Sequence, residues 1–468
     1  MADPAPRIEL PDGVTRCGEA LKGAGGRVYL VGGAVRDALL ERAVKDYDLE
    51  VFGLPAPAVI EALSRIARVE PAGDSFPVFK VADLPGVEGQ LDVALPRRDS
   101  KKGRGHRGIN AEADPFMPIE EAARRRDFTI NALMLDLSNR RLHDPFGGAR
   151  DLEARVLRMV DEATFADDPL RALRAAQFAA RFEMTVDPAT ARICASMRLD
   201  ELPAERILGE IEKALLQARR PSIAFRLLFE WDQLRAIAPE LLPLAATPQD
   251  PEWHPEGDVW THTLLCLDQA RLLIDDLDPA RAFAVMLGTL CHDLGKPATT
   301  KFEDGRIRSR GHEEAGIEPT LSLLDRWNVH TRGSFPLRDQ VVGLVRDHLK
   351  PGMLHQAREE VSAGAIRRLA RRVEADLLYR VARADCLGRT GDFSPVAMEW
   401  FIEEVRKLSV ERAGPVPLIL GRDILALGLR PGPEVGRILA EVYEQQLDSK
   451  VQTRDEAIDL ARSLVAAV

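Results

Sequence analysis

The chain has 468 residues, of which 45% are apolar, 29% are charged and 5% are aromatic. This length exceeds one typical hydrophobic core, and the composition is that of a water-soluble, mostly helical protein, so we expect several domains. The net charge of −10 excludes a uniformly basic nucleic-acid binder but allows local basic surfaces. No apolar run reaches the roughly 18 residues of a membrane span. The polar first residues lack the pattern of a signal peptide, so we expect no membrane association.

The cysteines are odd in number and scattered along the chain, at Cys17, Cys194, Cys266, Cys291 and Cys386. None forms a C-x-x-C pair, so the sequence predicts neither a disulfide framework nor a zinc–thiolate site. We therefore expect the reducing cytoplasm as the location.

The first motif is a strand, a glycine pair and two aspartates. The apolar run 28–31 leads into Gly32-Gly33, a helix is expected next, and a second strand is expected to carry Asp46 and Asp48. Glycines let backbone N–H groups approach a triphosphate, and a helix N-terminus adds its positive dipole. Two carboxylates on one face of a strand suit the divalent cations that phosphoryl transfer requires. A turn and a solvated Asp-x-Asp pair are each common alone, but together in this order they favour a nucleotidyl-transfer site.

This stretch, VGGAVRDALLERAVKDYDLEVF, resembles the signature of the polymerase-beta-like nucleotidyltransferases. Within them it is similar to the bacterial CCA-adding and poly(A) polymerase branch. The resemblance implies an α+β head with a mixed sheet and helices, followed by all-α domains. It also implies Mg²⁺ at Asp46 and Asp48 and nucleotide contacts from Gly32, Gly33 and Arg36.

A further strand, QLDVAL, contains Asp92. This residue is either a third carboxylate beside Asp46 and Asp48 or a solvated strand-end aspartate. A glycine-containing basic stretch follows, with Arg97, Arg98, Lys101, Lys102, Arg104 and Arg107. We expect a mobile loop that is either plain solvated surface or a clamp for triphosphate or an RNA end. In the resembled family a flexible loop occupies this place.

Residues 120–137, EEAARRRDFTINALMLDL, are expected to include a strand from Phe128 to Leu137. Arg126, Asp127 and Asn131 match the RRDxxxNA motif of the resembled family, which implies contacts to ribose and triphosphate. An aspartate or asparagine can hydrogen-bond a 2′-OH, and an arginine can pair with phosphate. The connector that follows matches the family's hinge at Asp144, Gly147 and Asp151.

In ADDPLRALRAAQFAARF the residues Asp168, Arg171, Arg174 and Phe178 recur at helical spacing. An intrahelical salt bridge between Asp168 and Arg171, worth about 0.3–0.5 kcal/mol, is one interpretation. The other is base recognition, because cytosine and adenine both place an amino donor beside a ring-nitrogen acceptor. The stretch is similar to the family's EDxxR element, with Asp167 in place of Glu, and this implies that Asp168, Arg171 and Arg174 contact the nucleotide.

Residues 190–242 are expected to be helices broken at Pro203 and Pro221, with the proline-rich segment 241–258 as a linker. Arg206, Lys213, Arg219 and Arg220 there offer either a surface for an RNA stem or ordinary solvated helix faces.

Beyond the linker, most of the nine histidines gather within about one domain length. Isolated histidines are usually core or capping residues, but imidazoles and carboxylates together suit transition metals that activate water for phosphoester hydrolysis. The pattern H…HD…H…H…D resembles the HD-domain phosphohydrolases. It implies a site for Ni²⁺, Co²⁺ or Mn²⁺ built from His262, His292, Asp293, His312, His348 and Asp385.

The resemblance covers nearly the whole chain. It predicts a head at 1–150, a helical nucleotide-selecting and RNA-binding part at 151–245, an HD domain at 246–395 and a tRNA-contacting helical segment at 396–468. The activity it implies is addition of CCA to tRNA 3′ ends from CTP and ATP without a template, plus phosphoester hydrolysis by the HD domain. Open alternatives are a poly(A) polymerase, an enzyme adding only CC or only A, an HD phosphohydrolase whose head binds RNA, and a non-catalytic RNA-binding protein.

Overall fold

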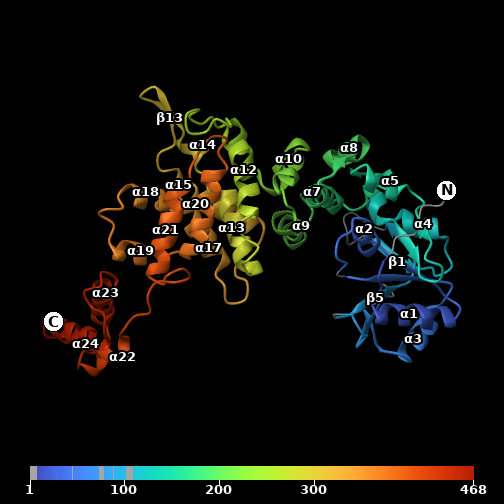
Figure 1. The fold of residues 1–468 in the computed structure, drawn as a ribbon, viewed down its shortest axis with the longest axis horizontal. Helices are drawn as coiled ribbons and strands as arrows, with labels where there is room; N and C mark the ends of the chain where they lie inside the picture. Colours follow the sequence, from blue (N-terminus) through green and yellow to red (C-terminus); the bar gives the residue numbers. More distant parts are fainter. Residues whose placement is uncertain (1–7, 45, 73–77, 88, 102–108, 468) are drawn as a thin grey trace. The chain divides into compact units, whose positions relative to one another are not determined.

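The structure, a computed structural model, describes residues 8–44, 46–72, 78–87, 89–101 and 109–467 (Figure 1). Two compact units account for the chain. The first contains Met1–Ile211 and Leu227–Ala236, and the second contains Glu212–Arg226 and Ile237–Val468. The predicted division into four parts is finer than this and stays a prediction.

A mixed seven-stranded sheet, in the order β3-β4-β5-β2-β1-β8-β9, forms the centre of the first unit. Only β2 and β5 run parallel; the other neighbouring pairs are antiparallel. The strands are β1 (Arg27–Val31), β2 (Asp48–Phe52), β3 (Arg68–Ala72), β4 (Val78–Ala82), β5 (Leu91–Ala94), β8 (Met134–Asp136) and β9 (Leu142–His143). Because all residues of β1 and β2 after the first are buried, whichever side they face, both faces of the sheet must be covered.

Helices cover the sheet. Tyr29, Val31 and Phe52 pack against Ala122 and Ala123 of α4 (Ile119–Arg124). Val28, Leu30, Leu49 and Val51 are buried as well, and α1 (Asp12–Gly23) contacts both β1 and α3 (Ala56–Ser64). The other helices that begin in this unit are α2 (Gly33–Leu39), α5 (Gly148–Glu153), α6 (Glu162–Phe165), α7 (Leu170–Phe182), α8 (Pro188–Ser196), α9 (Ala204–Gln217) and α11 (Leu234–Ile237). A short parallel pair, β10 (Val156–Leu157) and β11 (Thr185–Val186), joins them.

Two predictions in this unit are wrong in part. The strand expected from Phe128 to Leu137 is a 3-10 helix, η2 (Thr129–Asn131), followed by the short β8. The Asp127 carboxylate accepts the Phe128 N–H and the Asn131 amide, and such local bonds stabilise a turn at the expense of a strand. The stretch expected as a loop contains the antiparallel pair β6 (Arg97–Lys101) and β7 (Ile109–Ala113). Lys102, Arg104 and Arg107 lie outside the described residues.

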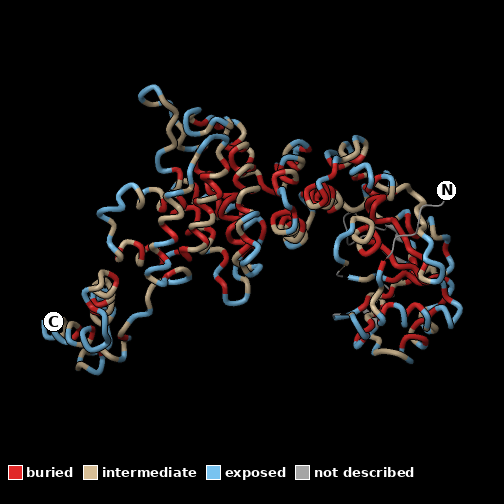
Figure 2. Tube along the Cα trace, in the orientation of Figure 1, coloured by how far each residue is buried: buried red, intermediate tan, exposed pale blue. Residues whose placement is uncertain are grey.

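The second unit is helical around α13 (Pro279–Cys291). Nearly every residue of α13 is apolar, and a helix that is apolar all round has to be buried. It packs against α12 (Val259–Arg271), α17 (Leu337–Asp347) and α20 (Ala375–Leu387), which form the buried centre of this unit in Figure 2. Around them lie α10 (Ser222–Glu230), α14 (Lys296–Thr299), α15 (His312–Ala315), α16 (Ile317–Arg326), α18 (Lys350–Gln356), α19 (Ala363–Ala370), α21 (Val396–Lys407) and the hairpin β12 (Lys301–Glu303) and β13 (Arg306–Arg308).

The proline-rich segment 241–258 is not a free linker. It begins within the 3-10 helix η3 (Pro239–Ala246), whose Leu241 and Leu244 are fully buried and which contacts α12. The prolines end regular α-helix, but the leucines between them still pack into the core of the second unit.

The chain ends with α22 (Gly421–Ala426), α23 (Pro433–Leu447) and α24 (Arg454–Ala466), which share a small apolar core that includes Ile424, Ile438 and Ala457. These are the helices expected for the C-terminal segment. Throughout the described ranges, no helix combines the length and the apolar character needed to cross a membrane.

Candidate active sites

Carboxylates gather where β2 and β5 lie side by side. The register places Asp48 directly opposite Asp92, as the first of the two interpretations of Asp92 requires. Asp46 precedes β2 and is not part of it, because the pairing with β1 begins at Val31 and Asp48. Loss of surrounding water raises the pKa of Asp48; Arg126 opposes the shift, and repulsion from Asp92, Asp46 and the neighbouring Glu50 adds to it. A cluster whose charges repel in this way fits a divalent cation.

Gly32 brings the backbone close to these carboxylates. Its φ of +69° lies in the region that favours glycine. A Cβ at this position would lie 3.4 Å from Arg126 Nη1 and 3.9 Å from Asp48 Oδ2. The predicted residues Gly32, Arg126 and Asp48 therefore meet at one point, and α2 begins at Gly33.

Glu50 was not singled out from the sequence. It is buried on the same face of β2 as Asp48 and accepts hydrogen bonds from Arg125 at 2.8 Å and Arg126 at 3.3 Å. The two-residue alternation from Asp48 was a signal that could have identified it. Glu50 thus fixes the Arg126 guanidinium beside Gly32.

Four predicted nucleotide-binding residues form one buried network. Arg36 Nη1 donates to Asn131 Oδ1 at 2.7 Å, Asn131 Nδ2 donates to Asp127 Oδ1 at 2.9 Å, and Arg174 Nε donates to Asp127 Oδ2 at 2.8 Å. Burial acts to raise the pKa of Asp127, but Arg174, Asn131 and the Phe128 N–H stabilise the carboxylate and hold the pKa below its usual value. Asp127 thus accepts hydrogen bonds from the Phe128 N–H, Asn131 and Arg174, and it holds the side chains of Asn131 and Arg174 in position.

Replacing Asp127 with alanine is expected to lower the local stability of the first unit by about 3 kcal/mol, since Arg174 and Asn131 lose a buried partner. Because the folded-state pKa is lowered, this contribution is present above about pH 4 and is lost as the pH falls towards the folded-state value. Amide hydrogen exchange of α7 measures this change in stability, because it reports on the first unit separately from the second. The exposed Glu61→Ala variant is the control, and equal protection in both variants would contradict the prediction.

The predicted pair Asp168 and Arg171 is placed differently from the expectation. Asp168 lies before α7 and accepts the Leu170 N–H at 3.1 Å and Arg206 Nη2 at 3.1 Å. Arg171 Nη1 and Nη2 donate to the backbone carbonyls of Thr164 and Arg125, each at 2.7 Å. Other partners replace the intrahelical salt bridge that was one interpretation of this pair, and Arg206 is a partner of Asp168 and not a free surface cation.

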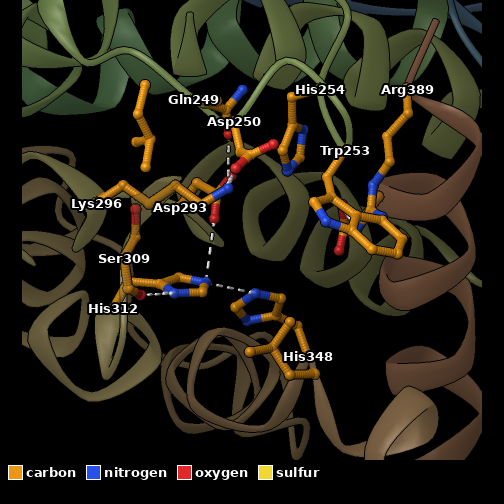
Figure 3. A pocket seen from close by; sticks show the side chains of 13 residues that line it. Gln249, Asp250, Trp253, His254, Asp293, Lys296, Ser309, His312, His348 and Arg389 are labelled. Atoms are coloured by element: carbon orange, nitrogen blue, oxygen red, sulfur yellow. Dashed lines mark hydrogen bonds and ion pairs between the residues drawn. The ribbon is translucent and has the colours of Figure 1, made fainter. Parts of the chain in front are cut away.

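The second unit brings all six predicted metal ligands together. His262 Nε2 lies 3.1 Å from Asp385 Oδ1 and 3.9 Å from Asp293 Oδ2. Asp293 also lies 3.2 Å from His292 Nε2 and 3.3 Å from His312 Nε2, and the Nε2 atoms of His312 and His348 are 3.2 Å apart. All six side chains are buried, and Figure 3 shows several of them facing a common pocket.

The hydrogen bonds of the rings suit metal binding. Nδ1 of His292, His312 and His348 each lies 2.7 Å from a backbone carbonyl three residues earlier, so Nδ1 carries the proton and Nε2 offers its lone pair. The buried Nε2 of His292 makes no hydrogen bond. Burial and the neighbouring imidazoles lower the pKa of His348 to about 3, so this ring is neutral at pH 7. Together with His262 and the carboxylates of Asp293 and Asp385, these three nitrogens fit a transition metal.

Glycine allows this cluster to assemble. A Cβ on Gly295 would lie 2.0 Å from the His312 carbonyl oxygen and 2.5 Å from the Gly316 nitrogen. The turn after His292-Asp293 can therefore contact α15, which carries His312, only because residue 295 has no side chain.

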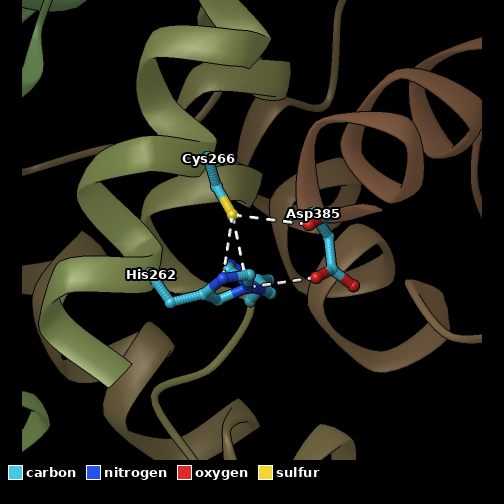
Figure 4. Close-up of side chains that lie close together, drawn as sticks. His262, Cys266 and Asp385 are labelled. Atoms are coloured by element: carbon cyan, nitrogen blue, oxygen red, sulfur yellow. Dashed lines mark hydrogen bonds and ion pairs between the residues drawn. The ribbon is translucent and has the colours of Figure 1, made fainter. Parts of the chain in front are cut away.

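Sequence reasoning missed several residues around the cluster. Lys296 Nζ donates to Gln249 Oε1 and lies close to Asp293 Oδ2, each at 2.7 Å. Glu256 Oε1 lies 2.8 Å from His262 Nδ1 and 2.9 Å from His254 Nδ1. Cys266 Sγ is 3.3 Å from His262 Nε2 (Figure 4). Lys296 follows Asp293 by three residues, a helical spacing that could have identified it; the other contacts depend on tertiary packing.

The first unit is a mixed sheet with clustered carboxylates, and the second is a helical unit with a histidine–aspartate cluster. Each unit matches the model of a known protein family. Residues 28–158 match the poly A polymerase head domain, and residues 259–389 match the HD domain. The chain is 37% identical over 428 residues to a multifunctional CCA protein of Xanthomonas euvesicatoria pv. vesicatoria, covering 89% of this chain and 96% of the relative. It is 39% identical over 377 residues to that of Stenotrophomonas maltophilia strain R551-3, covering 78% and 87%. The chain therefore belongs to the family of the multifunctional CCA proteins.

Solved structures agree on the fold. The Bacillus stearothermophilus CCA-adding enzyme in complex with CTP matches 98% of this chain and 100% of its own, with a TM-score of 0.64 and 20% identity. The Thermotoga maritima CCA-adding enzyme in complex with tRNA matches 97% and 94%, with a TM-score of 0.58 and 20% identity.

Proposed function

We propose that the protein adds the CCA sequence to tRNA 3′ ends from CTP and ATP without a nucleic-acid template, in the cytoplasm. The observation that carries this proposal is the carboxylate cluster at β2 and β5, in a chain related over most of its length to proteins named for CCA.

The residues of the head have distinct roles. Asp46, Asp48 and Asp92 would hold Mg²⁺, which supplies charge neutralisation for the triphosphate. Arg126, fixed by Glu50, and the backbone at Gly32 contact the triphosphate beside these carboxylates. The oxygen of the tRNA 3′-hydroxyl then forms a bond to the α-phosphorus and gives up its proton to water, the bond from the α-phosphorus to the bridging oxygen breaks, and pyrophosphate leaves.

Base choice is assigned to Asp168 and Arg171. Arginine has five N–H donors, and the two bonds to backbone carbonyls leave others to meet a ring nitrogen. Asp168 Oδ1 and Oδ2 retain lone pairs beyond their bonds to Leu170 and Arg206, and can accept from an exocyclic amino group. Because the backbone anchors Arg171, the pair is rigid before the nucleotide arrives, and uracil or guanine would meet reversed donors and acceptors.

Replacing Arg171 with alanine is expected to reduce the preference for CTP and ATP over UTP and GTP by roughly tenfold or more, because the donor opposing the wrong ring edge is lost. Single-nucleotide incorporation into tRNA measures the preference. Arg192→Ala, an exposed arginine of α8, is the matched control. An unchanged preference with a lower rate would show that Arg171 only secures the Thr164 and Arg125 segments.

The proposal is tested with purified protein, Mg²⁺ and tRNAs that end before CCA, after C or after CC. Each tRNA receives one nucleoside triphosphate, and the products are sized. The proposal expects addition of C to the first two tRNAs and of A to the third. An enzyme that adds only CC or only A would extend a subset of these ends.

We further propose that the second unit hydrolyses phosphoesters. The observation that favours this activity is the chain of short distances that joins His262, His292, Asp293, His312, His348 and Asp385, four of which line one pocket. These residues would hold Ni²⁺, Co²⁺ or Mn²⁺, which supplies an activated water. Glu256 fixes His262 by contact with its Nδ1, so Nε2 faces Asp385. Lys296, close to Asp293 in the pocket, offers a charge for a phosphate.

A further inference from the structure

The pocket at the histidine–aspartate cluster has an aromatic side chain at one side. Trp253 lines the pocket together with Asp293, His312 and His348, yet its side chain stays 49% exposed. The other tryptophans of the chain are Trp231, Trp260 and Trp327, which are buried, and Trp400, which is partly buried. A large aromatic ring left half in water beside metal-ligand residues is available to contact a ligand.

The turn that carries Trp253 is braced. The N–H groups of Trp253 and His254 donate to the Asp250 carbonyl oxygen at 3.1 and 2.8 Å, and Arg306 Nε donates to Asp250 Oδ2 at 3.0 Å. The Trp253 ring also lies 6.5 Å from the Phe393 ring, tilted by 35°. These contacts hold the indole in place without covering it.

Cations lie on both sides of the pocket. The Arg389 guanidinium lies 5.4 Å from the centre of the Phe393 ring and 3.6 Å from Asp385 Oδ1, so it belongs to the same side as Trp253. Lys296 lies beside Asp293 near His312, on the other side in Figure 3. The pocket therefore combines an aromatic surface, two cations and the ligand set for a metal, which complements a molecule that has both a flat ring and a phosphate.

We infer that Trp253 stacks on the base of a nucleotide whose phosphate lies at the histidine–aspartate cluster, and that it makes the hydrolytic site selective for nucleobase-bearing phosphoesters. The inference rests on the proposed hydrolase function. The base comes either from a free nucleotide or from the last nucleotide of an RNA. In the reaction, water adds to the phosphorus, one ester P–O bond breaks, and the alcohol oxygen leaves with a proton.

The test compares two five-membered cyclic phosphates, adenosine 2′,3′-cyclic phosphate and glycerol 1,2-cyclic phosphate, which has no base. The ratio compared is the kcat/KM for adenosine 2′,3′-cyclic phosphate divided by the kcat/KM for glycerol 1,2-cyclic phosphate. In Trp253→Ala this ratio is expected to fall roughly tenfold or more, through a higher KM for the nucleotide. Trp253→Phe is expected to restore most of the ratio. Phe302→Ala, which removes an exposed ring that does not line the pocket, is the control.

A second readout does not require the metal. Adenosine 2′,3′-cyclic phosphate is expected to quench the tryptophan fluorescence of the metal-free wild-type protein, and this quenching is expected to be absent in Trp253→Phe. An oligoribonucleotide with a terminal 2′,3′-cyclic phosphate, assayed in parallel, distinguishes an RNA end from a free nucleotide; a Trp253-dependent effect with either one supports the inference.

The outcomes separate the two proposals. If the wild-type protein hydrolyses neither cyclic phosphate, the hydrolase function and the inference both fail. If it hydrolyses them, but Trp253→Ala leaves the substrate ratio and the quenching unchanged, the hydrolase function stands and the inference on Trp253 is wrong.

Discussion

Replacing Asp48 with alanine is expected to reduce nucleotide addition by at least about 100-fold while tRNA binding persists. Asp48 is the carboxylate that faces Asp92 across the parallel pair of β2 and β5, and its removal opens the predicted cation site. It stands at the first residue of β2, so its loss removes little of the sheet. The same result is expected for Asp46→Ala. Extension of tRNA by labelled CTP measures the rate.

Glu61→Ala is a suitable control for this experiment, because Glu61 is an exposed carboxylate on α3 of the same unit. Retention of more than a few per cent of wild-type addition in Asp48→Ala would contradict the assigned role. If the wild-type protein added no nucleotide at all, and Asp48→Ala still hydrolysed phosphoesters, the alternative in which the head only binds RNA would be favoured.

Replacing His292 or Asp293 with alanine is expected to eliminate metal-dependent phosphoester hydrolysis while CCA addition continues. Each variant removes one ligand from a buried cluster, and a cluster missing a ligand loses or distorts its metal. The bound metal, measured by mass spectrometry of the dialysed protein, is expected to fall with the activity. Ni²⁺, Co²⁺ or Mn²⁺ is expected to stimulate hydrolysis, and Mg²⁺ is expected to stimulate addition.

His330→Ala is the matched control, since His330 is an exposed histidine of the same unit whose ring contacts Asn328. If the His292 variant stayed folded by circular dichroism but lost CCA addition, the two activities would be coupled and their assignment to separate sites would be wrong.

The head was predictable where local pattern decides structure. The alternation in β2 and the glycine pair identified the strand, the turn and Asp48. For Asp92 the sequence left two interpretations open, a third carboxylate beside Asp48 or a solvated strand-end residue. The sequence could not decide between them because the order β5-β2-β1 joins strands that are distant in sequence. The strand expected at 128–137 was wrong at its start, because hydrogen bonds that the Asp127 carboxylate accepts outweigh the strand preference of Phe128, Thr129 and Ile130.

The histidine–aspartate cluster was predictable because its spaced pattern of histidines and aspartates resembles a known family, and the six predicted ligands lie close together. Its supporting contacts were not. Glu256 lies in the segment expected as a linker, and its contact with His262 exists only after η3 packs against α12. The pairing of Asp168 with Arg206 likewise joins two segments whose approach no local pattern encodes.

The most direct test of CCA addition supplies all four nucleoside triphosphates together to a tRNA that ends before CCA, and sequences the 3′ ends of the products. We expect the added nucleotides to be C, C and A in that order, with no further nucleotide. A run of adenosines would show a poly(A) polymerase instead, and incorporation of U or G at these positions, or no extension, would contradict the proposed function.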